Sequence, residues 1–283
     1  MIYLKANAAG KTKREYVTAV VDDCKRIFNE TFADHFFRDD NLKVAFCTFE
    51  DQASVFEAFC SRFFPLYLAE GYSRTDYFAA QAMTNVPEDI CGILICLDTH
   101  DEGDVWYQII LHEMSHIFCI VNELGGENFQ EKYSKENLER ELQYHVMSVG
   151  YTIWKEFIAD YIASQLNPFA KTHSLVSLRK VVSQLDEEVN FNHPDRAQAF
   201  SQILFYIFQS PRIMAAPDVN AVVQVLDKNH ILPHKDRHQY YREVIELIFH
   251  QLDQELFWRI NVGFIEELGE IYLKMLFCEA YGY

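Results

Sequence analysis

The sequence predicts an α+β fold, in which a small mixed sheet and one buried helix precede a mainly helical C-terminal lobe. Short apolar, β-rich runs at residues 43–49 and 89–97 are typical of strands. From Ser134 onward almost every segment has the apolar spacing of a helix. Since no flexible linker separates the two parts, we expect one two-lobed unit, with an α/β lobe at residues 1–125 and a helical lobe at residues 126–283.

The individual elements follow from the periodicity of apolar residues and from the positions of Gly and Pro. In the first lobe we expect a helix at residues 15–37, a strand at 43–49, a helix at 51–68, and strands at 77–83 and 89–97. A polar loop follows, in which Asp104 or a neighbour would cap the next helix. In the second lobe we expect helices at residues 135–166 (with Gly150 as a candidate break), 175–189, 196–208, 219–229, 238–252 and 255–277.

The composition excludes several classes of partner. The formal net charge of −17 argues against a nucleic-acid ligand, which needs a basic face, and against adsorption to an anionic membrane. No run of about 18 apolar residues predicts a transmembrane helix, and the N-terminal sequence does not resemble a secretory signal. The seven cysteines form no C-x-x-C pair and lie mostly in apolar runs. We therefore expect reduced core cysteines and a cytoplasmic protein.

The segment 106–122, WYQIILHEMSHIFCIVN, contains His112, Glu113 and His116 in the order H-E-x-x-H. On a helix, residues four apart share a face, so that His112 and His116 can reach one point in space. Zinc accepts imidazole nitrogen at roughly 2.0–2.1 Å and lowers the pKa of a bound water to about 7. Glu113 is rotated away from the two histidines, where its carboxylate can take a proton from that water.

Apolar residues surround this motif on nearly all sides of the helix, which predicts that the helix is buried. A buried polar group without a partner costs about 1–3 kcal/mol, so the two imidazoles and the carboxylate need partners. The alternative is a chance match, with both histidines hydrogen-bonded in the core.

A catalytic zinc site needs a third protein ligand besides the two histidines. The extended pattern H-E-x-x-H-x-x-G-x-x-H is excluded, because Cys119 and Asn122 occupy the Gly and third His positions. Glu156 is the best candidate for the third ligand, on a helix that also carries Asp160 one turn later. The alternative for Glu156 is a solvated carboxylate that pairs with Lys155 or another cation.

Glu123 is a rival for the place of the third ligand, since it lies two turns after His116 on roughly the same face. A rigid helix would carry Glu123 about 10 Å away from the metal, because each residue adds 1.5 Å. The sequence therefore favours Glu156.

H-E-x-x-H on a buried helix, followed by E-x-x-x-D on a second helix, resembles the gluzincin group of zinc metallopeptidases, to which thermolysin belongs. The match covers residues 93–166. The resemblance implies a zincin-like fold, one zinc ion held by His112, His116 and Glu156, and Glu113 as the general base. It also implies that Asp160 orients a ligating imidazole through a hydrogen bond.

These observations predict a zinc-dependent metallopeptidase that acts on a peptide or protein substrate. Two alternatives stay open: a non-catalytic binding or regulatory protein with a zincin fold, and a zinc hydrolase of a non-peptide amide. The intact Glu113 argues against the first alternative. The Tyr or His that would stabilise the oxyanion is not identified by the sequence. Its candidates are Tyr144, His145, Tyr151, His193, His230, His234, His238, Tyr240 and Tyr241.

Overall fold

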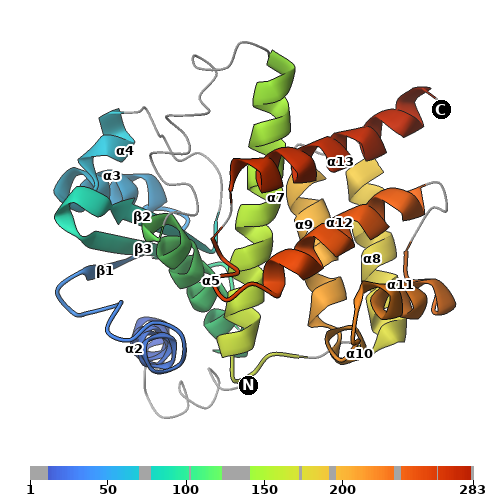
Figure 1. Ribbon diagram of the computed structural model, residues 1–283. Coiled ribbons are helices and arrows are strands. Elements are labelled where there is room, and N and C mark those ends of the chain that lie inside the picture. The colour runs from blue at the N-terminus through green and yellow to red at the C-terminus, as the bar shows by residue number, and fades with distance from the viewer. Residues whose placement is uncertain are drawn as a thin grey trace. The chain divides into compact units, whose positions relative to one another are not determined.

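The structure is a computed structural model. It describes residues 12–69, 78–101, 103–122, 141–171, 174–190, 196–232, 237–259 and 261–281, without the side chains of residues 141, 142, 190 and 278–281. The chain forms two compact units, Met1–Val121 with Ile162–Ala170, and Asn122–Tyr161 with Lys171–Tyr283. One small sheet accompanied by many helices confirms the predicted α+β class (Figure 1). The predicted lobe boundary after residue 125 falls outside the described residues.

The first unit contains the sheet and the helix that carries H-E-x-x-H. Its elements are α2 (Lys13–Thr31), β1 (Leu42–Cys47), α3 (Gln52–Phe63), α4 (Pro65–Ala69), β2 (Ala80–Asn85), the 3-10 turn η1 (Val86–Glu88), β3 (Ile90–Cys96) and α5 (Gly103–Val121). The helix predicted at residues 15–37 ends at Thr31, and the one predicted at residues 51–68 is divided in front of Pro65. Asp104 lies in the first turn of α5.

The three strands lie in the order β1-β3-β2, with β1 parallel and β2 antiparallel to the central β3. One face of the sheet packs against α3 and α4 through a core that includes Phe56, Phe59, Met83 and Leu94. Figure 1 shows α3 and α4 on one side of the sheet, and α2 on the other. The predicted strand at residues 89–97 is thus the central strand, as its continuous apolar run indicates.

Aromatic side chains join the end of α5 to α2 and to the residues that follow α2. The ring centroid of Phe118 lies 5.6 Å from that of Phe28, 4.9 Å from Phe32 and 5.1 Å from Phe36. Such pairs add about 0.5–1.5 kcal/mol each beyond their buried area. They hold the turn of α5 that carries His116, two residues before Phe118.

The cysteines behave as predicted wherever their side chains are described. The buried and unbridged ones are Cys24, Cys47, Cys60, Cys91, Cys96 and Cys119. Burial raises the pKa of the Cys91 thiol to about 12, with a smaller contribution from Asp89. These thiols are packing groups in the core.

The second unit is helical throughout its described residues. Its elements are α7 (Glu141–Leu166), α8 (Leu175–Asn190), α9 (Arg196–Gln209), α10 (Pro211–Met214), α11 (Val219–Lys228), α12 (His238–Leu252) and α13 (Val262–Tyr281). The last residues of α7 belong to the first unit. Within the second unit, α12 and α13 run across α8 and α9 (Figure 1). Among the described helices none combines the length and the apolar character that a bilayer crossing needs.

Two predictions for these helices were wrong. α13 begins at Val262 instead of residue 255, because Asn261 accepts a hydrogen bond from the backbone N–H of Phe264 at 2.9 Å and so caps the helix. The candidate break at Gly150 does not occur, and α7 runs through this residue as one helix.

Gly150 is instead the point at which α7 crosses α13. A Cβ atom on Gly150 would lie 2.1 Å from the carbonyl oxygen of Ile265, and one on Gly269 would lie 2.0 Å from that of Val146. Both obstructing atoms belong to the backbone, so they cannot rotate away. The two glycines therefore permit a close crossing that fixes α7 against α13.

We predict that Gly269→Ala destabilises the protein by about 1–3 kcal/mol, the usual cost of inserting a methyl group into a packed interface. Its helix propensity alone would favour Ala by about 1 kcal/mol. Gly263→Ala is the matched control in the same helix, because its Cβ would meet only the Asn261 Oδ1 atom at 3.3 Å. Urea denaturation of both variants measures the difference. Equal stability of the two would contradict the close crossing.

Candidate metal centre

The two histidines of the motif lie on one face of α5. The ring centroids of His112 and His116 are 4.4 Å apart, and the two rings are nearly perpendicular, at 89°. His116 is buried and His112 is half-buried. Their neighbours Ile110, Leu111 and Met114 are fully buried, which confirms the prediction that the motif lies on a buried helix.

Glu156 on α7 completes a group of three ligand side chains. One ligand atom from each of His112, His116 and Glu156 lies within 4.8 Å of the other two. Among the described residues, this is the group of His, Cys, Asp and Glu side chains close enough to hold one metal ion. The rival Glu123 lies outside the described residues, so the choice between Glu156 and Glu123 stays a prediction.

Glu156 also forms an ion pair with Lys155, whose Nζ atom lies 3.1 Å from Glu156 Oε1. The alternative interpretation expected this pairing with Lys155, but it also expected a solvated carboxylate, and only 15% of the Glu156 side chain is exposed.

The chain that follows Glu156 packs against α5 within the first unit. Asn167 donates a hydrogen bond from Nδ2 to Gln108 Oε1 at 3.2 Å. The Phe169 ring meets the Tyr107 ring edge-on, with centroids 4.9 Å apart. These contacts attach the C-terminal end of α7 to the helix that carries the two histidines.

Two imidazoles and a carboxylate fit zinc by their chemistry. Nitrogen and carboxylate oxygen are both zinc ligands, and a His₂Glu set with an open fourth position is a catalytic arrangement. Ligand atoms on a tetrahedral zinc at about 2.0–2.2 Å lie roughly 3.4 Å from one another. The three ligand atoms, which lie within 4.8 Å of one another, would therefore have to approach one another by at most about 1.4 Å to bind one ion.

Glu113 takes a different position from the three ligand residues. Its Oε2 atom accepts a hydrogen bond from the backbone N–H of Ala82 in β2, at 2.5 Å. Glu113 is half-buried and follows His112 directly on α5. The carboxylate is thus tied to the sheet by a hydrogen bond, while its backbone adjoins that of His112.

Asp160 lies one turn after Glu156 on the uninterrupted α7. Burial and, to a smaller extent, the Asp160 carboxylate raise the pKa of Tyr206 in α9. Its predicted hydrogen bond to a ligating histidine stays a prediction. Tyr206 was missed by the sequence reasoning, because its position in an apolar helix gave no sign that it would lie near Asp160.

One of the candidates for oxyanion stabilisation is now excluded. Tyr241 is fully buried, and its hydroxyl donates a hydrogen bond to Asp186 Oδ1 at 2.8 Å. Arg237 Nη1 donates to the same oxygen at 3.0 Å, so the three side chains form an ionic cluster inside the second unit. Tyr241 is therefore a core residue. His193 and His234 lie outside the described residues.

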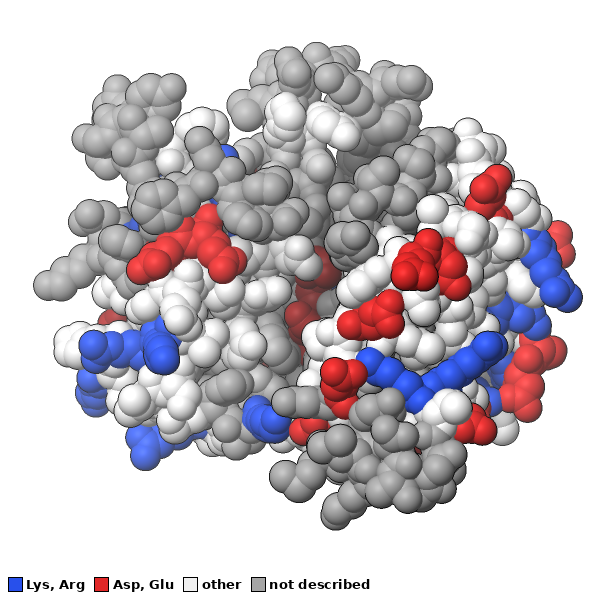
Figure 2. Space-filling model, turned by 180° about the vertical axis from the view of Figure 1, so that it is seen from behind, with Lys and Arg blue, Asp and Glu red and all other residues white. Residues whose placement is uncertain are grey.

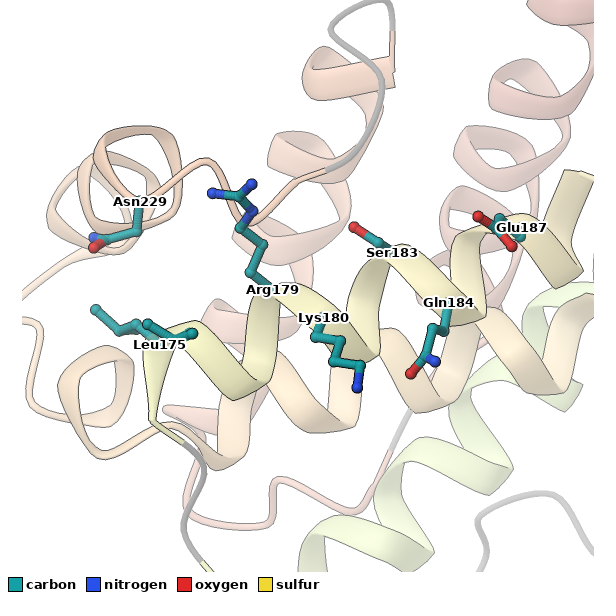
Figure 3. A pocket seen from close by; sticks show the side chains of 8 residues that line it. Leu175, Arg179, Lys180, Ser183, Gln184, Glu187 and Asn229 are labelled. Carbon is teal, nitrogen blue, oxygen red and sulfur yellow. The ribbon is translucent and has the colours of Figure 1, made fainter.

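A surface hollow of about 590 Å³ opens on α8 in the second unit. Its lining residues are Leu175, Val176, Arg179, Lys180, Ser183, Gln184, Glu187 and Asn229. Figure 3 shows the labelled side chains of α8 projecting in different directions, while Asn229 comes from the end of α11. On the face shown in Figure 2, basic and acidic side chains are interspersed, and neither kind forms one continuous patch. The hollow therefore lacks the convergence that marks the His112 group.

Comparisons with known proteins give no assignment: no family model, no curated protein and no solved structure matches this chain. The residues of the site are therefore the basis for inferring a function.

We predict that Glu156→Ala lowers zinc affinity by more than the 10–100-fold that loss of an outer hydrogen bond typically causes, since it removes a direct ligand. Glu123→Ala should bind zinc like the wild type. Zinc content after dialysis against a competing chelator, with circular dichroism to check folding, measures both. Retention of zinc by folded Glu156→Ala, or its loss in Glu123→Ala, would contradict the assignment.

Proposed function

We propose that this protein is a zinc-dependent peptidase, which hydrolyses a peptide bond with Glu113 as the general base. The observation that supports the proposal most strongly is the convergence of His112, His116 and Glu156 beside a carboxylate that is not one of the three. Direct ligands and a separate base are the two components that metal-assisted hydrolysis needs.

In this proposal His112, His116 and Glu156 hold the ion. When bound, zinc supplies Lewis-acid polarisation of a carbonyl and a lowered pKa for water. The Glu113 carboxylate accepts the proton of the attacking water and passes it to the leaving amine, as a general base that later acts as an acid. Its contact with Ala82 leaves Glu113 Oε1 for that proton.

The separation of Glu113 from the ligand group favours catalysis over binding alone. A protein that only binds metal or a partner needs no second carboxylate held next to the two imidazoles. The choice of a peptide over another amide is supported by the resemblance to gluzincins, since the same residues would hydrolyse either bond. An assay with both peptides and simple amides is therefore needed to identify the class of substrate.

We predict that Glu113→Gln keeps its zinc and its fold but loses about 10²–10⁴-fold in hydrolysis, the usual contribution of a general base. The amide oxygen of Gln can still accept the Ala82 N–H, so the local structure should persist. Glu57→Gln, at an exposed position of α3 in the same unit, is the matched control. Cleavage of a peptide library, with parallel simple amides, measures the rates.

Three results would refute this proposal. A zinc-loaded wild-type protein that cleaves neither peptides nor simple amides would show that it is not a hydrolase of this kind. Unchanged turnover in zinc-loaded Glu113→Gln would remove Glu113 from the role of base. Loss of zinc from a folded Glu113→Gln variant would make Glu113 a ligand.

A further inference from the structure

We propose that the backbone N–H of Ala82 is a positioning group for catalysis, which holds the Glu113 carboxylate in the orientation that a general base needs. The inference depends on the proposed function of Glu113. Its starting point is the hydrogen bond from Ala82 N to Glu113 Oε2, which joins β2 to α5 over 31 residues of sequence.

The register of β2 explains why this N–H is available. β2 pairs with β3 and lies at the edge of the described sheet. The carbonyl oxygen of Ala79 accepts a hydrogen bond from Cys96 N. In an antiparallel pair, the backbone groups of every second residue point toward the partner strand, so those of residue 79 and of every second residue after it point toward β3. Ala82 and Thr84 therefore point their N–H groups away from β3. Consistent with this, the Thr84 N–H donates to the Tyr67 hydroxyl at 3.3 Å.

The contact distinguishes the two carboxylates of the site. A hydrogen bond from an N–H to an ionised carboxylate is shorter and stronger than one between neutral groups. It fixes the direction of Glu113, while Glu156 joins the two histidines. Glu113 is half-buried, so part of its side chain is removed from solvent. The edge strand thus gives Glu113 a fixed orientation without using a second side chain.

The position of Glu113 matters for rate because a displacement of about 1 Å at a reacting group can cost 10²-fold. If Ala82 only joined β2 to α5, its removal would lower stability and leave the turnover of the folded enzyme unchanged. A positioning role instead lowers kcat with little change in KM, since the substrate still binds.

Ala82→Pro tests the role directly. Proline has no N–H, and at an outward-facing position of an edge strand it removes no bond of the sheet. We expect zinc content to be retained and kcat to fall by about 10–100-fold, with little change in KM. Ala82→Gly keeps the N–H and should recover most of the lost rate. Thr84→Pro, which removes the neighbouring outward N–H, is the matched control and should retain the wild-type kcat.

Hydrogen exchange tests the contact without any hydrolysis. In protein labelled with ¹⁵N-alanine, the Ala82 amide should exchange slowly in the wild type and much faster in Glu113→Ala. The amide of Ala79, which directly precedes β2 and lies outside this contact, is the internal reference. Equal exchange of Ala82 in both proteins would show that the bond does not exist in solution, and would overturn the inference.

The kinetic outcomes separate this inference from the proposed function. If the wild type hydrolyses amides and Glu113→Gln does not, but Ala82→Pro matches Thr84→Pro in kcat, then the positioning role is wrong and the general base stands. If the zinc-loaded wild type hydrolyses no amide, the proposed function fails and the positioning role fails with it, whatever the exchange of Ala82 shows.

Discussion

The structure depends on a constraint that burial imposes on polar side chains. α5 and α7 are strongly apolar helices, and His112, His116 and Glu156 interrupt their buried surfaces. Polar groups removed from water need partners, and charged ones need opposite charge. The two imidazoles and the carboxylate converge, with one ligand atom of each within 4.8 Å of the others. In the proposed function, one metal ion is the partner of all three.

The remaining features hold these helices in place. Phe118 packs in an aromatic cluster with α2 and so fixes α5. Gly150 and Gly269 let α7 cross α13 at a distance that no side chain would permit. The sheet contributes the Ala82 N–H to Glu113. Each of these contacts restrains a segment that carries one residue of the candidate site. Such restraint keeps the side chains of a site in fixed positions.

Sequence reasoning identified the chemical groups because their spacing is local. H-E-x-x-H shows its geometry within two helical turns, and the acidic pair at Glu156 and Asp160 does so within one. The apolar run at residues 89–97 likewise identified the central strand. These features could be predicted because a helix or a strand converts sequence spacing directly into a shared face.

The features that the sequence did not reveal arise from tertiary contacts. The bond from Ala82 to Glu113 depends on the register of β2 against β3, and no local pattern specifies that register. Gly150 suggested a break on propensity, whereas the approach of α13 makes it a crossing point. Tyr241 was a candidate for stabilising the oxyanion, but its hydroxyl is buried in a hydrogen bond with Asp186. In each case a partner distant in sequence decides the role.

X-ray absorption at the zinc K-edge of the loaded protein tests the central claim most directly, because it reports the ligand atoms themselves. The account predicts two imidazole nitrogens at about 2.0–2.1 Å and oxygen ligands at about 2.0–2.2 Å. In zinc-loaded Glu156→Ala the imidazole scattering should remain, while the carboxylate contribution disappears. A sulfur ligand at about 2.3 Å, or a spectrum that Glu156→Ala leaves unchanged, would contradict it.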